Sequence, residues 1–108
     1  MKFFVYSGSF MKNGRYHQYY LQGKTFLGKG FIEGYAKYIL GSLHGILPEE
    51  GKRVQGEVYD IDPETLAKMD FLMNAETAFN KGVVDVELEN GETLQAETYI
   101  WNGTVSSP

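Results

Sequence analysis

A short turn near the start of the chain, Ser7-Gly8-Ser9, follows an apolar run at residues 3–6. Glycine and serine allow a tight turn after a strand, and the backbone amides of such a turn can bind a carboxylate or an oxyanion. The turn could equally be a plain connector, because such turns are common. No G-x-x-x-x-G-K-[ST] or G-x-G-x-x-G motif occurs at a strand-to-helix junction, which argues against a phosphate loop.

The carboxylates are the next candidates for chemistry. Glu57 lies in the middle of a predicted strand, where it could be buried, paired or exposed. Glu49 and Glu50 lie on a stretch with proline and glycine and are expected in solvent. Glu76 follows a predicted helix in an irregular stretch, where a lone acid is usually exposed. If that stretch folds back over the first turn, loss of water would raise the pKa of Glu76 towards that of a general base.

Histidine and cysteine chemistry is poorly supported. His17 and His44 lie in separate segments, without an H-x-x-x-H or H-E-x-x-H pattern, so we expect no metal site. His17 is predicted to make a structural hydrogen bond near the first turn rather than to act as a base. The absence of cysteine excludes disulfides and a thiol nucleophile. No G-x-S-x-G elbow is present for serine catalysis.

Length and composition predict one small domain. The 108 residues suffice for a single core, which we place at residues 1–103, with a polar tail at 104–108. The net charge of −4 and the scattered basic residues argue against nucleic-acid binding. No apolar run is long enough for a signal sequence or a membrane span, so we expect a soluble cytoplasmic protein that does not bind membranes. The sequence does not indicate the oligomeric state.

The patterns in the first half of the chain predict strands and one short helix. Residues 2–6 are rich in β-forming side chains, and residues 15–22 carry aromatic residues at near-helical spacing that end at Gly23, a predicted C-cap. Residues 25–40 are predicted to form two strand pieces with a bend, because three glycines interrupt them. Residues 41–52 contain further glycines and a proline, which predict a loop.

The second half contains the clearest local patterns. Residues 54–61 predict a central strand, and Asp62-Pro63 predicts a helix start with aspartate as N-cap and proline in the first turn. Leu66, Met69 and Met73 then form a core-facing stripe. Asn90-Gly91, between residues 83–89 and 92–101, predicts a hairpin. This order of elements predicts an α+β fold around a small, curved, mainly antiparallel sheet or barrel with short helices.

An ordered set of motifs resembles the gamma-glutamylcyclotransferase-like family. Residues 5–10 (V-Y-S-G-S-F) resemble its V-Y-G-[ST]-L loop with one extra residue, and residues 54–59 (V-Q-G-E-V-Y) match its V-x-G-E-[LV]-Y strand. Residues 79–86 resemble Y-x-R-x-x-V-x-V, and residues 96–100 resemble the closing A-x-x-Y-[VIL] strand. Gly14 and His17 resemble the family's G-x-x-[NH]-H part, with Tyr16 at the place often held by asparagine, and Leu47-Pro48 resembles its L-P/Y-P step. The resemblance extends from Phe3 to Trp101.

The resemblance implies a reaction without metal or cofactor. In this family the substrate's α-amine attacks its own γ-glutamyl carbonyl, so that 5-oxoproline forms and an amine leaves. Loop amides bind the substrate's carboxylate and carbonyl, and one glutamate transfers the proton. The implied ligand is a small γ-glutamyl or amino-acid-like compound. The implied substrate-binding residues are Tyr6, Ser7, Gly8, Ser9, Phe10, Met73 and Phe79.

The sequence departs from the family pattern at three linked positions: Met73 replaces the glutamate, Phe79 the tyrosine and Lys81 the arginine. Glu76 is then the candidate catalytic residue, if it reaches the site. The alternative is a non-catalytic binding module for a small carboxylated or amino-acid-like ligand, with Lys81 as a point charge. Met73 itself either completes the core stripe or lines the pocket at the family's acid position.

Overall fold

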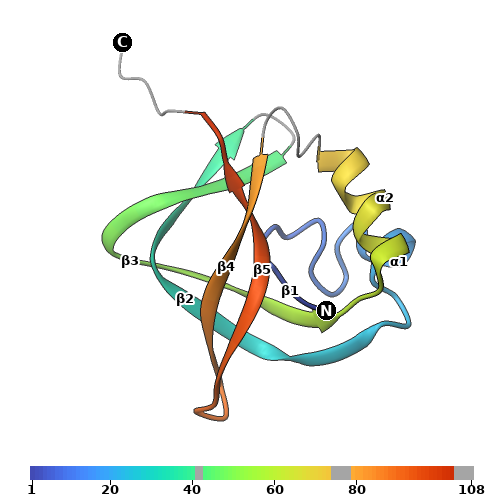
Figure 1. Ribbon diagram of the computed structural model, residues 1–108, viewed down its shortest axis with the longest axis horizontal. Helices are drawn as coiled ribbons and strands as arrows, with labels where there is room; N and C mark the ends of the chain where they lie inside the picture. The colour runs from blue at the N-terminus through green and yellow to red at the C-terminus, as the bar shows by residue number, and fades with distance from the viewer. Residues whose placement is uncertain (41–42, 74–78, 104–108) are drawn as a thin grey trace.

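The computed structural model describes residues 1–40, 43–73 and 79–103. Five strands and two short helices follow one another along the chain (Figure 1). Their bounds are β1 Lys2–Val5, α1 His17–Tyr20, β2 Thr25–Leu40, β3 Leu43–Asp60, α2 Pro63–Met73, β4 Phe79–Leu88 and β5 Thr93–Trp101.

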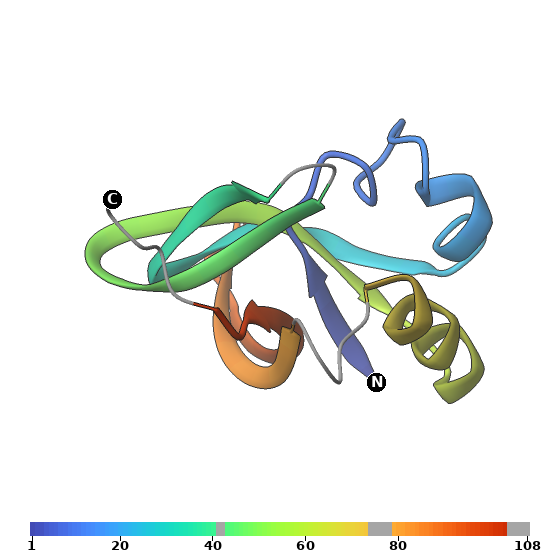
Figure 2. The same cartoon turned by 90° about the horizontal axis from the view of Figure 1, so that it is seen from above.

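The five strands close into a barrel in the order β1-β3-β2-β4-β5. β3 pairs with both β1 and β2, so the strand predicted at residues 54–61 is confirmed, as part of a longer strand of the closed barrel. The barrel closes where β1 meets β5 in parallel, with Phe3 opposite Glu97. In the view from above, both helices lie at one end of the molecule, and the far part of the β2–β3 hairpin lies at the other (Figure 2). The α+β fold with a small, mainly antiparallel barrel is the architecture that the sequence predicts.

The β2–β3 hairpin corrects two sequence predictions. Residues 25–40 form one continuous strand instead of two pieces, and the predicted loop at residues 41–52 is wrong because β3 begins at Leu43. Pro48 pairs with Tyr35 immediately after a register shift, so the proline lies at a bulge, where the loss of an amide donor is tolerated. Gly34 on β2 and Gly51 on β3 both lie within this irregularity, between the pairs Glu33–Arg53 and Tyr35–Pro48, with φ angles of 84° and 83°. The glycines therefore bend a long strand instead of ending it.

The local patterns of the second half are confirmed. Asp62 caps α2, because its carboxylate accepts a hydrogen bond from the amide of Thr65 at 2.7 Å. The hairpin of β4 and β5 turns at Asn90-Gly91, where Gly91 has a φ of 89°.

The helix predicted at residues 15–22 in the first half of the chain is shorter, with four residues at His17–Tyr20, and Gly23 follows it with a φ of 84°.

Two clusters of buried side chains form the core. All five strands contribute to one of them, which therefore fills the barrel; it consists of Phe4, Tyr6, Ile32, Ile46, Val54, Val58, Val84, Val86, Leu88 and Ala96. The other lies beneath the helices and consists of Phe3, Val5, Phe10, Leu21, Tyr59, Ile61, Leu66, Met69, Met73, Phe79 and Tyr99. Because side chains alternate along a strand, β1 sends Phe4 into the barrel and Phe3 and Val5 towards the helices.

Candidate functional site

The first turn begins directly after β1, and Tyr6 fixes its start. Tyr6 is 3% exposed, and its hydroxyl donates a hydrogen bond to the backbone oxygen of Tyr99 on β5 at 2.8 Å. Burial raises the pKa of Tyr6 well above its usual value, so the phenol stays neutral and remains a donor. The ammonium of Lys37 on β2 donates to the carbonyl of Tyr6 at 3.4 Å. The turn therefore starts from a point held by two other strands.

The turn itself is closed by its own hydrogen bonds. The amides of Phe10 and Met11 both donate to the carbonyl of Ser7, at 3.0 and 3.1 Å. The amide of Ser9 lies 3.4 Å from the hydroxyl oxygen of Ser7. The amide of Gly8 has no acceptor among the described residues, and Gly8 is exposed. Gly8 is thus the exposed position of this turn whose amide is not bonded within the described part of the chain.

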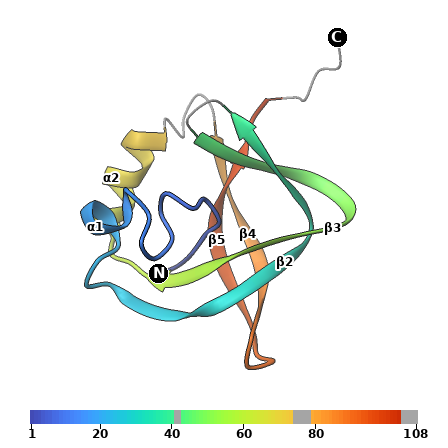
Figure 3. The ribbon, with the colours of Figure 1, turned by 180° about the vertical axis from the view of Figure 1, so that it is seen from behind.

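Residues 14–17, which follow the turn, pack against it and hold its shape. A Cβ atom at Gly14 would overlap the backbone oxygens of Gly8 and Ser9, so only glycine fits there. The amide of Tyr16 donates to the carbonyl of Ser9 at 2.8 Å. The Nδ1 atom of His17 lies 3.0 Å from the carbonyl oxygen of Phe10, which agrees with the structural hydrogen bond predicted for this histidine. Figure 3 shows this segment folded between β1 and α1.

Glu57 anchors the turn to the barrel, a role that the sequence left open. Its side chain is buried, and one carboxylate oxygen accepts hydrogen bonds from the amide of Lys12 and the hydroxyl of Tyr59, both at 2.9 Å. Burial, followed by the hydrogen bond to Glu57, raises the pKa of Tyr59. Tyr59 lies two positions from Glu57 on the same face of β3, and this spacing is the pattern that could have revealed the pair.

Met73 and Phe79 lie on either side of residues 74–78, and both are buried. Met73 is 3% exposed and Phe79 is 1% exposed, in the same cluster as Phe10 of the first turn. Met73 therefore completes the stripe of Leu66 and Met69, the core alternative of the two that the sequence allowed. The cluster also brings Met73, Phe79 and Phe10 together. Glu76, the candidate catalytic residue, lies outside the described residues.

A polar triad ties α2 to β4 and β5 beside this cluster. Asp70 accepts hydrogen bonds from the ammonium of Lys81 and the hydroxyl of Tyr99, both at 2.7 Å. Burial is the main cause that raises the pKa of Tyr99, and the bond to Asp70 adds to it. Lys81, which the sequence offered as a charge for a ligand carboxylate, is paired with Asp70 instead. Its ammonium still lies at the partly exposed surface.

The described residues also bear on the other ligand classes. Within residues 1–40, 43–73 and 79–103, no group of three or more histidine, aspartate or glutamate side chains could hold a metal ion. In the same part of the chain, no helix is long and apolar enough to cross a membrane.

The comparisons with known proteins agree with this architecture. The model of the family described as "Gamma-glutamyl cyclotransferase, AIG2-like" matches residues 3–108. A Methanocaldococcus jannaschii protein with the provisional name of a gamma-glutamylcyclotransferase is 32% identical over 99 residues, which cover 91% of this chain and 82% of that protein. The gamma-glutamylcyclotransferase family protein YtfP of Escherichia coli is 40% identical over 72 residues, 67% of this chain and 61% of YtfP.

The fold is also similar to solved structures. The crystal structure of a mouse AIG2-like protein matches with a TM-score of 0.81 and 23% identity, over 96% of this chain and 78% of the mouse chain. At this identity the likeness concerns the fold alone.

Proposed function

Since the chain belongs to the gamma-glutamyl cyclotransferase, AIG2-like family, we propose that it cyclises a small γ-glutamyl compound to 5-oxoproline. In this reaction the free α-amine of the substrate attacks the γ-carbonyl carbon and forms the ring C–N bond. The amide bond to the leaving amine breaks, and the one proton that the attacking amine nitrogen loses passes to the leaving nitrogen. Nucleophile and electrophile belong to one molecule, so correct positioning supplies much of the rate enhancement.

The observation that carries the proposal is the first turn, in which Gly8 alone presents an exposed amide without an acceptor in the described chain. The amides of Phe10 and Met11 are bonded inside the turn, and Glu57 and Gly14 hold its position. A fixed amide that is not bonded within the protein suits a substrate carboxylate or the oxyanion of the ring-closing step. Ser7 and Ser9 add hydroxyl groups beside it.

We assign the proton transfer to Glu76. Met73, at the family's acid position, has no ionisable group and is buried, so it cannot serve as the base. Glu76 is the acid in the sequence between Met73 and Phe79. The side chains of Met73 and Phe79 belong to the same cluster as Phe10 of the turn. A carboxylate near this apolar cluster would have a raised pKa, as a general base at neutral pH requires. We place the reaction in the cytoplasm.

The direct test is product formation from γ-glutamyl-ε-lysine and from γ-glutamyl amino acids, with 5-oxoproline measured by mass spectrometry. Removal of a general base lowers rates by about 10²–10⁴-fold, so Glu76→Gln should reduce turnover by that factor. Glu64→Gln is the matched control, because Glu64 is an exposed acid in the first turn of α2. Unchanged turnover in Glu76→Gln would show that the base is assigned wrongly.

A second candidate function follows from the core position of Met73 and the pairing of Lys81 with Asp70. Both leave the α2–β4 junction, that is Met73 and Phe79 with the neighbouring pair Asp70 and Lys81, without a free proton carrier among the described residues. The site would then bind a small carboxylated or amino-acid-like ligand without converting it. Binding to the folded state stabilises it by about 2.7 kcal/mol at a ligand concentration of a hundred dissociation constants. A raised Tm with γ-glutamyl compounds but no 5-oxoproline would favour this function.

A further inference from the structure

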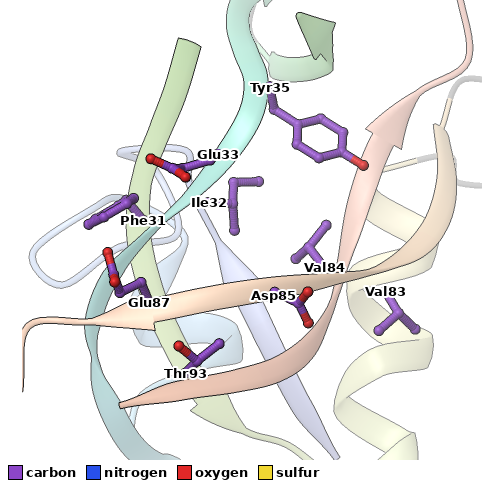
Figure 4. Close-up of a pocket in the computed structure, with 9 residues that line it drawn as sticks. All are labelled: Phe31, Ile32, Glu33, Tyr35, Val83, Val84, Asp85, Glu87 and Thr93. Carbon is purple, nitrogen blue, oxygen red and sulfur yellow. The ribbon is translucent and has the colours of Figure 1, made fainter. Parts of the chain in front are cut away.

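The barrel has an opening between β2 and β4. Within the described residues their ladder pairs are Gly30–Leu88 and Phe31–Glu87, and no pair joins the two strands further along, towards Glu33 and Asp85. A groove of about 450 Å³ lies between them. In Figure 4, Ile32 of β2 and Val84 of β4 lie between the two strands, and the acidic side chains Glu33, Asp85 and Glu87 lie around the groove.

A backbone hydrogen bond at the β4–β5 hairpin shows which groups of β4 face this opening. The amide of Leu88 donates to the carbonyl of Glu92, so the even-numbered residues of β4 bond towards β5. Bonding direction alternates along a strand, and therefore Val83, Asp85 and Glu87 direct their amides and carbonyls towards β2. Glu87 meets Phe31 there, whereas Val83 and Asp85 have no strand partner on that side among the described residues.

The β2 side of the opening follows the same rule. The amide of Glu89 donates to the carbonyl of Lys29 at 3.0 Å, so the odd-numbered residues of this part of β2 face β4. The next such residue after Phe31 is Glu33, and Gly34 then bulges the strand away. The opening is therefore bordered by unpaired backbone groups on both strands, and such an edge can accept a further strand.

The side chains around the opening define what such a strand must carry. Beneath the opening, Ile32 and Val84 are only 1% and 5% exposed, so little room remains and the inward positions of an added strand must carry small apolar side chains. Its outward positions would lie beside Glu33, Asp85 and Glu87, which are exposed. Opposite charges side by side on one face of a sheet stabilise pairing.

The acidic side chains around the opening favour a positively charged strand over an acidic one. Arg53 pairs with Glu33 at 3.2 Å and lies over the ring of Phe31 at 4.2 Å. Asp85 and Glu87 have no ion pair within the described part of the chain. A second copy of this chain, with a net charge of −4, is electrostatically disfavoured.

We propose that this groove binds an extended segment of a partner protein, with lysine or arginine alternating with small apolar residues, which adds as a strand to the edge of β4. The inference is independent of the proposed cyclotransferase activity, because none of the residues that form the groove belongs to the first turn or to the α2–β4 junction.

The test uses the whole protein and a short fluorescein-labelled peptide that alternates lysine and valine. Fluorescence anisotropy should show binding that weakens with salt, and NMR should show the largest amide shifts at Val83 and Asp85. A peptide that alternates glutamate and valine is the charge control. A lysine–valine peptide with N-methylated backbone amides is the strand-pairing control, because it keeps the charge but loses donors.

The decisive variant is Val83→Pro. It removes an amide that faces the groove, keeps every charge and breaks no bond to β5, so the fold should persist. One lost hydrogen bond weakens peptide binding by about tenfold. The double variant Asp85→Asn, Glu87→Gln tests the charges and should also weaken binding, whereas Glu92→Gln at the hairpin turn should not.

Three outcomes would overturn the proposal. Equal binding of the glutamate–valine peptide would remove the charge argument. Full binding to Val83→Pro, or of the N-methylated peptide, would show electrostatic attraction without strand addition. A dimer of the free protein that Val83→Pro dissociates would make a second copy the occupant. If Val83→Pro does not fold, the N-methylated peptide and the Asp85–Glu87 double variant decide the question.

Discussion

The first turn and the α2–β4 junction lie at the same end of the barrel but are built differently. In the turn, backbone groups bond to one another and to the buried carboxylate of Glu57, and the amide of Gly8 remains exposed. At the junction, Met73 and Phe79 are packed in the core, and Asp70 and Lys81 pair with each other. The turn thus presents an exposed glycine whose amide has no acceptor among the described residues, whereas core packing and an ion pair account for the described part of the junction.

The largest expected effect tests the junction. Met73→Glu would bury an unpaired carboxylate in an apolar cluster and should lower the free energy of unfolding at pH 7 by about 4 kcal/mol or more. Urea unfolding measures this loss. The penalty should shrink as the pH falls towards 5, because a raised pKa keeps the buried carboxyl protonated there. Phe71→Glu is the matched control on the same helix, since Phe71 is 91% exposed. A stable Met73→Glu protein that forms 5-oxoproline faster would show that Met73 borders the site.

A smaller effect tests the bracing of the turn. Gly14→Ala places a methyl group against the backbone oxygens of Gly8 and Ser9, so the turn must shift at a cost of about 1–3 kcal/mol. Gly8→Ala has open space and serves as the stability control. Thermal unfolding compares the two. Equal Tm values for both variants would contradict a rigid turn.

Glu57 connects the turn to β3, and its removal should cost less than the junction change. Glu57→Ala leaves the amide of Lys12 and the hydroxyl of Tyr59 without their acceptor, which costs about 1–3 kcal/mol. Glu57→Gln keeps an acceptor oxygen and should lose less stability. If the two variants unfold at the same urea concentration, the hydrogen bonds to Glu57 do not hold the turn.

Close to pH 10, the smallest effect concerns alkaline stability. The pKa values of Tyr6, Tyr59 and Tyr99 are raised on folding, so their neutral forms favour the folded state. This stability is fully present below the unfolded pKa of about 10 and is lost as the pH rises above it. Urea unfolding at pH 8 and above pH 10 should show the loss, and Tyr99→Phe should reduce its slope. Stability independent of pH in this range would contradict buried, neutral phenols.

Local patterns in the sequence predicted what depends on neighbouring residues. Asp62-Pro63 starts α2, and Asn90-Gly91 turns the β4–β5 hairpin, because caps and tight turns depend on a few adjacent residues. The loop predicted around Pro48 was wrong, because pairing with β2 outweighed the local preference of proline and glycine. Long-range pairing of this kind cannot be derived from residues 41–52 alone.

The site was only partly accessible from the sequence for the same reason. The Ser7-Gly8-Ser9 turn was visible as a local pattern, but the role of Glu57 depends on the amide of Lys12, which lies 45 positions away in the chain. The pairing of Lys81 with Asp70 likewise depends on how α2 lies against β4. The proposed role of Glu76 remains a prediction.

The most direct test of the account is an NMR titration of the Glu76→Gln protein with γ-glutamyl-ε-lysine, because this variant should bind the substrate without consuming it. We predict that the amide of Gly8 shifts most and that the resonances of Met73 and Phe79 shift with it, which would place the ligand between the turn and the junction. Binding that leaves the Gly8 amide unchanged, or shifts concentrated elsewhere on the barrel, would contradict the account.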